Sequence, residues 1–95
     1  MENSEENIFE KEKQNVSWNK FIYNFCLSKI EIVKKSEFND ETFGSWLIEF
    51  GNKRIVYDGK DSVLIIQNRN LGNWKDEMEI SKENLTEKKV TKILK

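Results

Sequence analysis

The chain has 95 residues, 16 of them basic and 17 acidic, and its formal net charge at pH 7 is −1. This length builds one small domain around one core and leaves little room for a deep catalytic cleft, so an enzyme is not expected. The sequence contains no histidine, which excludes the commonest general base, the commonest zinc ligand and every Ser-His or Cys-His nucleophile pair.

Residues 1–15 are polar and acidic, and they predict a flexible or partly helical tail in front of the folded domain. A helix is predicted from Trp18 to Ser28, with Ser17 as its N-cap. Apolar residues recur there at helical spacing and predict one buried stripe, formed by Trp18, Phe21, Ile22, Phe25 and Cys26. Cys26 is the only cysteine, and its apolar neighbours are typical of a small buried hydrophobe.

The segment after this helix has two interpretations. Ile30 and Ile32 alternate as in a strand, whereas Leu27, Ile30 and Val33 fit a helix that continues. The β-branched side chains favour a strand over residues 29–36.

The next strand is predicted from the alternation in GSWLIEF, residues 44–50. One face of this strand collects Trp46, Ile48 and Phe50, and the other collects Leu47 and Glu49. Gly51-Asn52 follows and suits a two-residue hairpin turn in which the glycine takes a positive φ. The residues RIVY form the returning strand.

A second, longer turn begins at Asp58-Gly59 and extends through Asp61. The strand SVLIIQ that follows is apolar on both faces, which predicts a central strand covered on both sides. After a Gly-Asn loop, WKDEMEI alternates cleanly. Trp74, Asp76, Met78 and Ile80 are expected on one face, and Lys75, Glu77 and Glu79 on the other.

A last helix is predicted after Thr86, which can act as its N-cap, with Leu85 packing on Val90 as a hydrophobic staple. The elements together predict an α+β fold: an N-terminal helix, an antiparallel meander sheet of about five strands, and a short C-terminal helix. Residues 16–95 are expected to form a single domain.

The sequence shows little that resembles a catalytic or ligand site. The four glycines are dispersed at strand junctions and do not form a phosphate-binding loop, and DGKDS lacks the spacing of a calcium loop. We therefore expect no metal and no cofactor. The near balance of charge argues against nucleic-acid binding, although the lysines of the last helix, with Arg54 and Arg69, would supply a small basic patch.

Clustered carboxylates are the more informative feature. Four acids and no basic residue lie between Glu37 and Asn52, and acids that face outward from a sheet can form a negative surface that attracts a basic protein. Trp46 lies beside the acidic loop and has two interpretations, a core residue or an interface anchor. The predicted partner-binding residues are Asp40, Glu41, Trp46, Glu49, Glu77 and Glu79.

Three segments carry a resemblance to a known class of proteins: FGSWLIEFGNKRIVYDGKDSVLIIQ, NWKDEMEI and TEKKVTKIL. Over about residues 17–94 the chain resembles small bacterial immunity proteins, which are encoded beside polymorphic or contact-dependent toxins. The resemblance implies that the protein binds one cognate toxin domain, such as a nuclease, and blocks it. It transfers no site residue, because these families bind their toxins through variable surfaces.

Other functions remain open at this stage. The chain is also compatible with a phage- or plasmid-encoded inhibitor of another bacterial protein, with a small nucleic-acid-binding or ligand-binding domain, and with a homo-oligomer joined through a sheet edge. An apolar signal core and a membrane span are both missing from the sequence, and with a single cysteine no intrachain disulfide can form. These features favour the cytoplasm.

Overall fold

The computed structural model describes residues 16–94, so the predicted tail over residues 1–15 lies outside the described residues. The elements follow in the order α2 (Val16–Lys29), β1 (Lys35–Asn39), η1 (Asp40–Thr42), β2 (Ser45–Phe50), β3 (Lys53–Asp58), β4 (Val63–Asn70), β5 (Asn73–Ile80), η2 (Lys82–Asn84) and α3 (Glu87–Ile93). This order confirms the predicted α+β fold.

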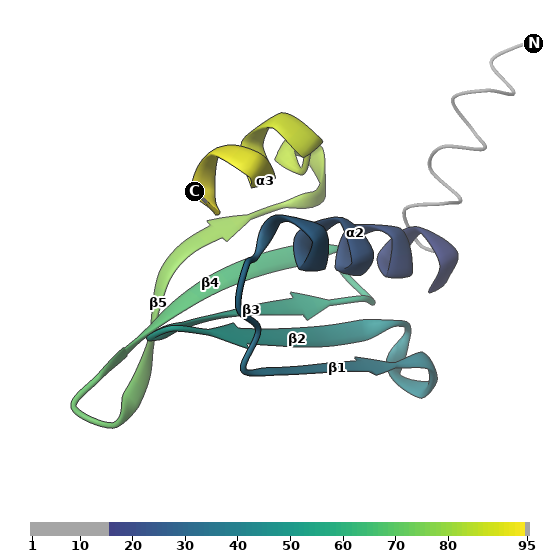
Figure 1. The fold of residues 1–95 in the computed structure, drawn as a ribbon. Coiled ribbons are helices and arrows are strands. Elements are labelled where there is room, and N and C mark those ends of the chain that lie inside the picture. The colour runs from purple at the N-terminus through teal and green to yellow at the C-terminus, as the bar shows by residue number, and fades with distance from the viewer. Residues whose placement is uncertain (1–15, 95) are drawn as a thin grey trace, which may run out of the picture.

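The five strands form one antiparallel meander in the order β1-β2-β3-β4-β5. Both helices lie on the same face of the sheet (Figure 1). Within residues 16–94 no element covers the other face, which we call the open face. Coverage of β4 on both sides was therefore a wrong prediction: Leu64 and Ile66 are buried under the helices, but Ile65 lies on the open face and is only half-buried.

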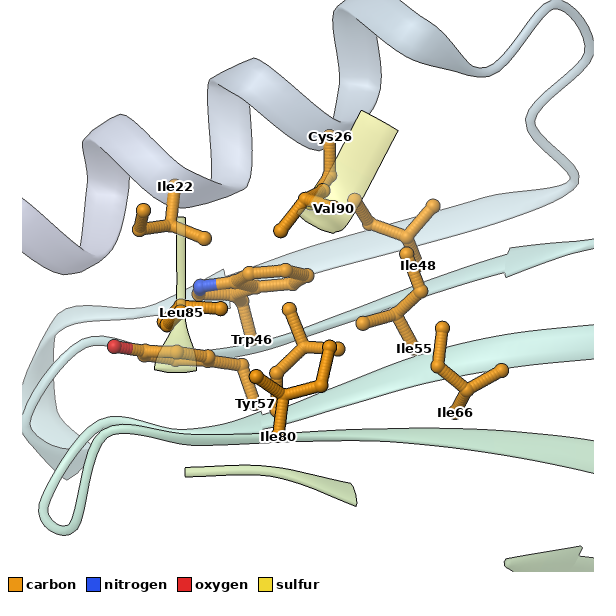
Figure 2. Packing of buried hydrophobic residues seen from close by; sticks show 11 residues of the cluster. Ile22, Cys26, Trp46, Ile48, Ile55, Tyr57, Ile66, Ile80, Leu85 and Val90 are labelled. Carbon is orange, nitrogen blue, oxygen red and sulfur yellow. The ribbon is translucent and has the colours of Figure 1, made fainter. Parts of the chain in front are cut away.

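The core lies between the helices and the covered face of the sheet (Figure 2). Trp46 and Tyr57 stack at its centre, with ring centroids 5.0 Å apart and an interplanar angle of 11°. The buried apolar residues are Ile22, Cys26, Trp46, Ile48, Ile55, Tyr57, Leu64, Ile66, Ile80, Leu85 and Val90. Full burial of each large side chain contributes about 1.5–3 kcal/mol, so this layer holds the helices on the sheet.

The helix α2 is longer than predicted, and its buried side is different. Ser17 lies inside α2 and is not its N-cap. The buried residues of α2 are Asn19, Ile22 and Cys26, while Phe21 is 46% exposed. The predicted apolar stripe was therefore partly wrong, because one of its places is taken by a polar residue.

The strand predicted over residues 29–36 is also wrong. Lys29 ends α2, and β1 begins only at Lys35, which pairs with Glu49 of β2. Ile30 and Val33 pack against the core from an irregular connection, whereas Ile32 is 75% exposed. Of the two residues that suggested an alternating strand, only Ile30 packs against the core, so the alternation did not mark a strand face.

The tight turn after β2 and the cap of α3 are confirmed. Phe50 pairs with Lys53, leaving Gly51-Asn52 as the two-residue turn, and Gly51 has a φ of 56°. At the other end of the chain, the Thr86 hydroxyl accepts a hydrogen bond from the backbone N–H of Lys89 at 3.2 Å. These local motifs formed as their sequences predicted.

A β-bulge interrupts the predicted alternation of β5. Ile66 pairs with Met78, but its neighbour Gln67 pairs with Asp76, so Glu77 is the extra residue. A bulge turns the side chains on its two sides to different faces. Met78 and Ile80 remain on the covered side, whereas Trp74 and Asp76 lie with Glu79 on the open face, and their predicted grouping was wrong.

Candidate interaction surface

The six predicted partner-binding residues do not form one surface. Trp46 is 3% exposed and stacked in the core, so it cannot reach a partner. Glu77 was predicted to face outward beside Glu79, but its carboxylate bonds the ammonium of Lys53 at 2.7 Å. Lys53 shares its strand face with buried Ile55, which places Glu77 on the helix side of the sheet.

Asp40 and Glu41 lie together in η1, at one end of the sheet. The Asn39 side chain accepts a hydrogen bond from the backbone N–H of Glu41 at 2.9 Å, which fixes the start of this turn. An open hollow of about 450 Å³ lies here, and it is lined by Glu37, Phe38, Asn39, Asp40 and Glu41. Three carboxylates therefore surround one surface depression.

Phe43, which follows η1, is an exposed aromatic residue in an unusual backbone conformation. Its φ is 60° and 59% of its surface is exposed. The left-handed region is uncommon for a bulky residue and costs of order 1–3 kcal/mol. Such conformations persist only where the surrounding structure holds them.

The loop between β3 and β4 lies directly against Phe43. A Cβ on Gly59 would overlap the carbonyl oxygen of Phe43 and come within 2.8 Å of the carbonyl carbon of Gly44. Asp58 shapes this second loop, since its carboxylate accepts hydrogen bonds from the backbone N–H groups of Lys60 at 3.0 Å and Asp61 at 3.4 Å. The two loops thus form one end of the molecule, the acidic end, made of Asp40, Glu41, Phe43, Asp58 and Asp61.

Asn19 joins the two loops from below. Its side-chain amide donates to the carbonyl oxygens of Phe43 at 2.7 Å and Gly59 at 3.2 Å, and its oxygen accepts from the hydroxyl of Tyr57 at 2.8 Å. Asn19 is fully buried, so these bonds form in a low-dielectric interior. Burial also raises the pKa of Tyr57, which keeps the hydroxyl protonated and able to donate.

Sequence reasoning did not find Asn19, although the sequence contained a clue. Asn19, Ile22 and Cys26 follow the helical spacing of one buried face. A polar residue at such a position must have hydrogen-bond partners, and here they are loop carbonyls far along the chain.

The open face carries a short apolar row across the strands. The register aligns Leu47, Val56 and Ile65, with Glu37 at one end of the row and Glu79 at the other. The three apolar side chains are half-buried and both acids are exposed. An apolar strip with acidic margins therefore continues from the acidic end onto the sheet.

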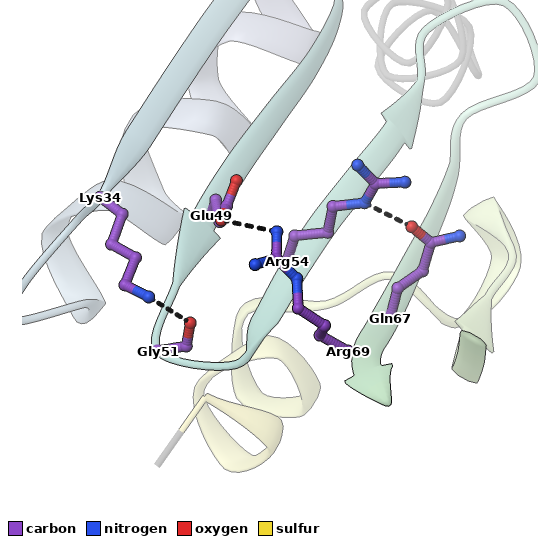
Figure 3. A network of polar contacts seen from close by, with 6 residues as sticks. All are labelled: Lys34, Glu49, Gly51, Arg54, Gln67 and Arg69. Carbon is purple, nitrogen blue, oxygen red and sulfur yellow. Dashed lines mark hydrogen bonds and ion pairs between the residues drawn. The ribbon is translucent and has the colours of Figure 1, made fainter. Parts of the chain in front are cut away.

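Beyond this row, a fixed polar network occupies the far part of the open face (Figure 3). Arg54 donates to the Gln67 side chain at 2.6 Å, and Gln67 in turn donates to Asp76 at 2.7 Å. Arg69 contacts Glu49 at 3.5 Å. The negative charge of Glu49, another predicted partner-binding residue, is thus balanced by the guanidinium of Arg69 in the same chain.

Cys26 is the one cysteine of the chain, and its thiol is buried in the core. Burial raises the pKa of the Cys26 thiol to about 12, so it is not a thiolate nucleophile at neutral pH. No three histidine, cysteine or carboxylate side chains of these residues form a group suited to a metal ion. The same residues contain no helix long and apolar enough to cross a membrane.

Comparison with known proteins gives no relative from which a function could be transferred. No family model, no curated protein and no solved structure matches the chain. The arrangement of its own residues is therefore the basis for assigning a function.

Proposed function

We propose that the protein binds and neutralises a basic protein partner, and that this partner is a cognate bacterial toxin domain such as a nuclease. The observation that carries the proposal is the acidic end, where exposed Phe43 lies among the carboxylates of two loops that Asn19 holds together. Aromatic residues, Phe among them, are enriched at the buried centre of interfaces, and charged residues are more common at the rim, so Phe43 suits an anchor with acidic groups around it.

The charge distribution supports a basic partner. Asp40, Glu41, Asp58 and Asp61 are all exposed, and Lys60, whose ammonium lies 5.9 Å from the Phe43 ring, is the one cation within these two loops. A field of one sign raises the rate of encounter with a partner of the opposite sign and disfavours other partners. The nucleic-acid groove of a nuclease has that opposite sign.

Rigidity supports tight binding. The bonds from Asn19 fix both loops before the partner arrives, so little conformational entropy remains to be lost on binding. The toxin is then neutralised because the carboxylates of the acidic end occupy its basic groove in place of the phosphates of a nucleic acid. A stable inhibitor complex buries roughly 1,200–2,000 Å² in total, which the acidic end and the adjoining open face can supply. We assign this inhibition to the cytoplasm.

The experiment is co-expression with the product of the adjacent gene. We expect this product to arrest growth when expressed alone and to be harmless together with the protein. The variant Asp40→Lys/Glu41→Lys is expected to lose protection, since it reverses the field at the acidic end. Binding of the purified pair should weaken at least tenfold, which corresponds to about 1.4 kcal/mol.

A matched control carries the same change of charge elsewhere. Glu31→Lys/Glu87→Lys reverses two exposed acids outside the acidic end and should still protect. Equal protection by both variants would contradict the proposed surface, and an adjacent product that neither arrests growth nor binds would contradict the proposed function.

A further inference from the structure

Leu71 is the most exposed large hydrophobic residue of the described chain. It is 95% exposed and lies at the tip of the hairpin between β4 and β5, where Asn70 pairs with Asn73. A Cβ added to neighbouring Gly72 would meet nothing within 4 Å, so the tip projects into open space. Packing within residues 16–94 therefore does not explain the leucine.

The backbone conformation of Leu71 is energetically unfavourable for a leucine. The φ angles of Leu71 and Gly72 are 55° and 85°, so both central residues of the turn are left-handed. That turn type strongly favours Asn-Gly. In the other two-residue turn of the described chain, the first central position also has a positive φ, and there it is occupied by a glycine, Gly51, with a φ of 56°. A strained, exposed residue that stabilises nothing points to selection for binding.

The base of this hairpin is braced. Two guanidinium groups lie over the ring of Trp74. The Cζ atom of Arg54 is 4.4 Å from the ring centroid, and the Cζ atom of Arg69 is 4.6 Å from it. The backbone N–H of Arg69 also donates to the carbonyl of Asn52 at 2.8 Å, which ties the hairpin to the neighbouring turn. The leucine is thus presented on a fixed support, so binding it costs little ordering entropy.

We propose that Leu71 is a second anchor for the same protein partner, inserted in an apolar recess at the far side of the partner's interface. This inference rests on the proposed function. β4 extends from the loop beside Phe43 to the tip, and its eight residues span roughly 25 Å. Phe43 lies beyond the start of β4, so the two anchors are farther apart than this. An interface at the upper end of the standard range buries about 1,000 Å² on each protein, a patch roughly 35 Å across, which is the size that one partner needs to cover both anchors.

Charge gives the partner one orientation. Residues 68–75 contain no acid and two cations, of which Arg69 pairs with Glu49 and Lys75 is exposed, whereas the opposite end of the sheet is acidic. We therefore expect the recess that receives Leu71 to be rimmed by carbonyl or carboxylate oxygens, which suit the ammonium of Lys75, while the partner's basic groove meets Phe43 and its acids. Reversed docking would place like charges together, which is unfavourable.

The test compares three variants of the full chain against the adjacent-gene product at physiological ionic strength. Leu71→Asn is expected to raise the melting temperature by roughly 2–6 °C, because Asn-Gly suits this turn, and to weaken binding about tenfold. This combination separates a binding residue from a structural one, since a structural leucine would lose stability on replacement. Ile32→Asn, which removes another exposed aliphatic residue, is the control and should bind as the wild type does.

The third variant, Phe43→Asn, keeps the two proposals distinguishable. If Phe43→Asn loses binding while Leu71→Asn binds as the wild type does, the second anchor is wrong and the proposed function stands. If the wild type does not bind the product, both fall. A duplex DNA probe that binds the wild type but not Leu71→Asn would also overturn the inference, because the hairpin would then serve a nucleic acid.

Discussion

The hydroxyl of Tyr57 donates a hydrogen bond to the side-chain oxygen of Asn19 across 2.8 Å in the buried interior. This contact joins the central strand of the sheet to α2, and the amide of the same asparagine extends it to the loops at the acidic end. The acidic end is therefore positioned by a polar contact inside the core.

Removing members of this contact should destabilise the fold in a graded way. Tyr57→Phe leaves the Asn19 oxygen without this bond and should cost about 1–2 kcal/mol of unfolding free energy. Asn19→Ala also removes the two bonds to loop carbonyls and should cost about 2–4 kcal/mol. Urea unfolding measures both values. Amide exchange at Gly44 should accelerate more in Asn19→Ala than in Tyr57→Phe, and equal acceleration would contradict the positioning role.

A methyl group at Gly59 should separate the two loops. Gly59→Ala places a carbon against the backbone of Phe43 and Gly44, which cannot yield as a flexible side chain would. We expect a loss of about 2–4 kcal/mol in unfolding free energy and weaker partner binding.

The matched control for this substitution is Gly72→Ala. It adds the same methyl group where nothing lies within 4 Å, at a φ of 85°. Only the backbone preference is lost there, so the cost should be about 1 kcal/mol. If Gly59→Ala were as mild as this control, the close contact between the loops would be refuted.

Cys26 should make stability fall at alkaline pH. Burial raises its pKa from 9.0 to about 12, so the unfolded chain releases this proton at lower pH than the folded chain does. The contribution of Cys26 is therefore full below pH 9 and is lost as the pH rises towards 12. Between pH 9 and pH 10.5 the wild type should lose about 2 kcal/mol more than Cys26→Ala. Parallel urea-unfolding profiles of the two proteins would contradict this assignment.

Local sequence motifs predicted much of this fold because their causes are local. The turn at Gly51-Asn52 follows from the freedom of glycine at positive φ, and the start of α3 follows from the hydroxyl of Thr86. The meander follows from short turns between apolar runs. Each of these motifs needs only neighbouring residues to form.

The errors arose where distant residues decide the structure. The bulge at Glu77 depends on how β5 meets β4 and Lys53, and the alternation within WKDEMEI contains no trace of it. The burial of Asn19 depends on loop carbonyls 24 and 40 positions away. Composition located the acids of the candidate site, but only the register shows which of them share a face.

The register places Glu77 and Glu79, which are two positions apart in the sequence, on different faces of the sheet. Their substitution should therefore have different effects on partner binding. Glu79 is exposed beside Ile65 on the open face, whereas Glu77 pairs with Lys53 on the helix side. Glu79→Lys should slow association with the basic partner several-fold at low salt, with the difference shrinking as salt screens the charges. Glu77→Lys should leave association unchanged and lower the unfolding free energy by no more than about 1 kcal/mol, since the pair is solvent-exposed. Stopped-flow association measures the two rates, and equal slowing by both variants would mean that the open face does not meet the partner.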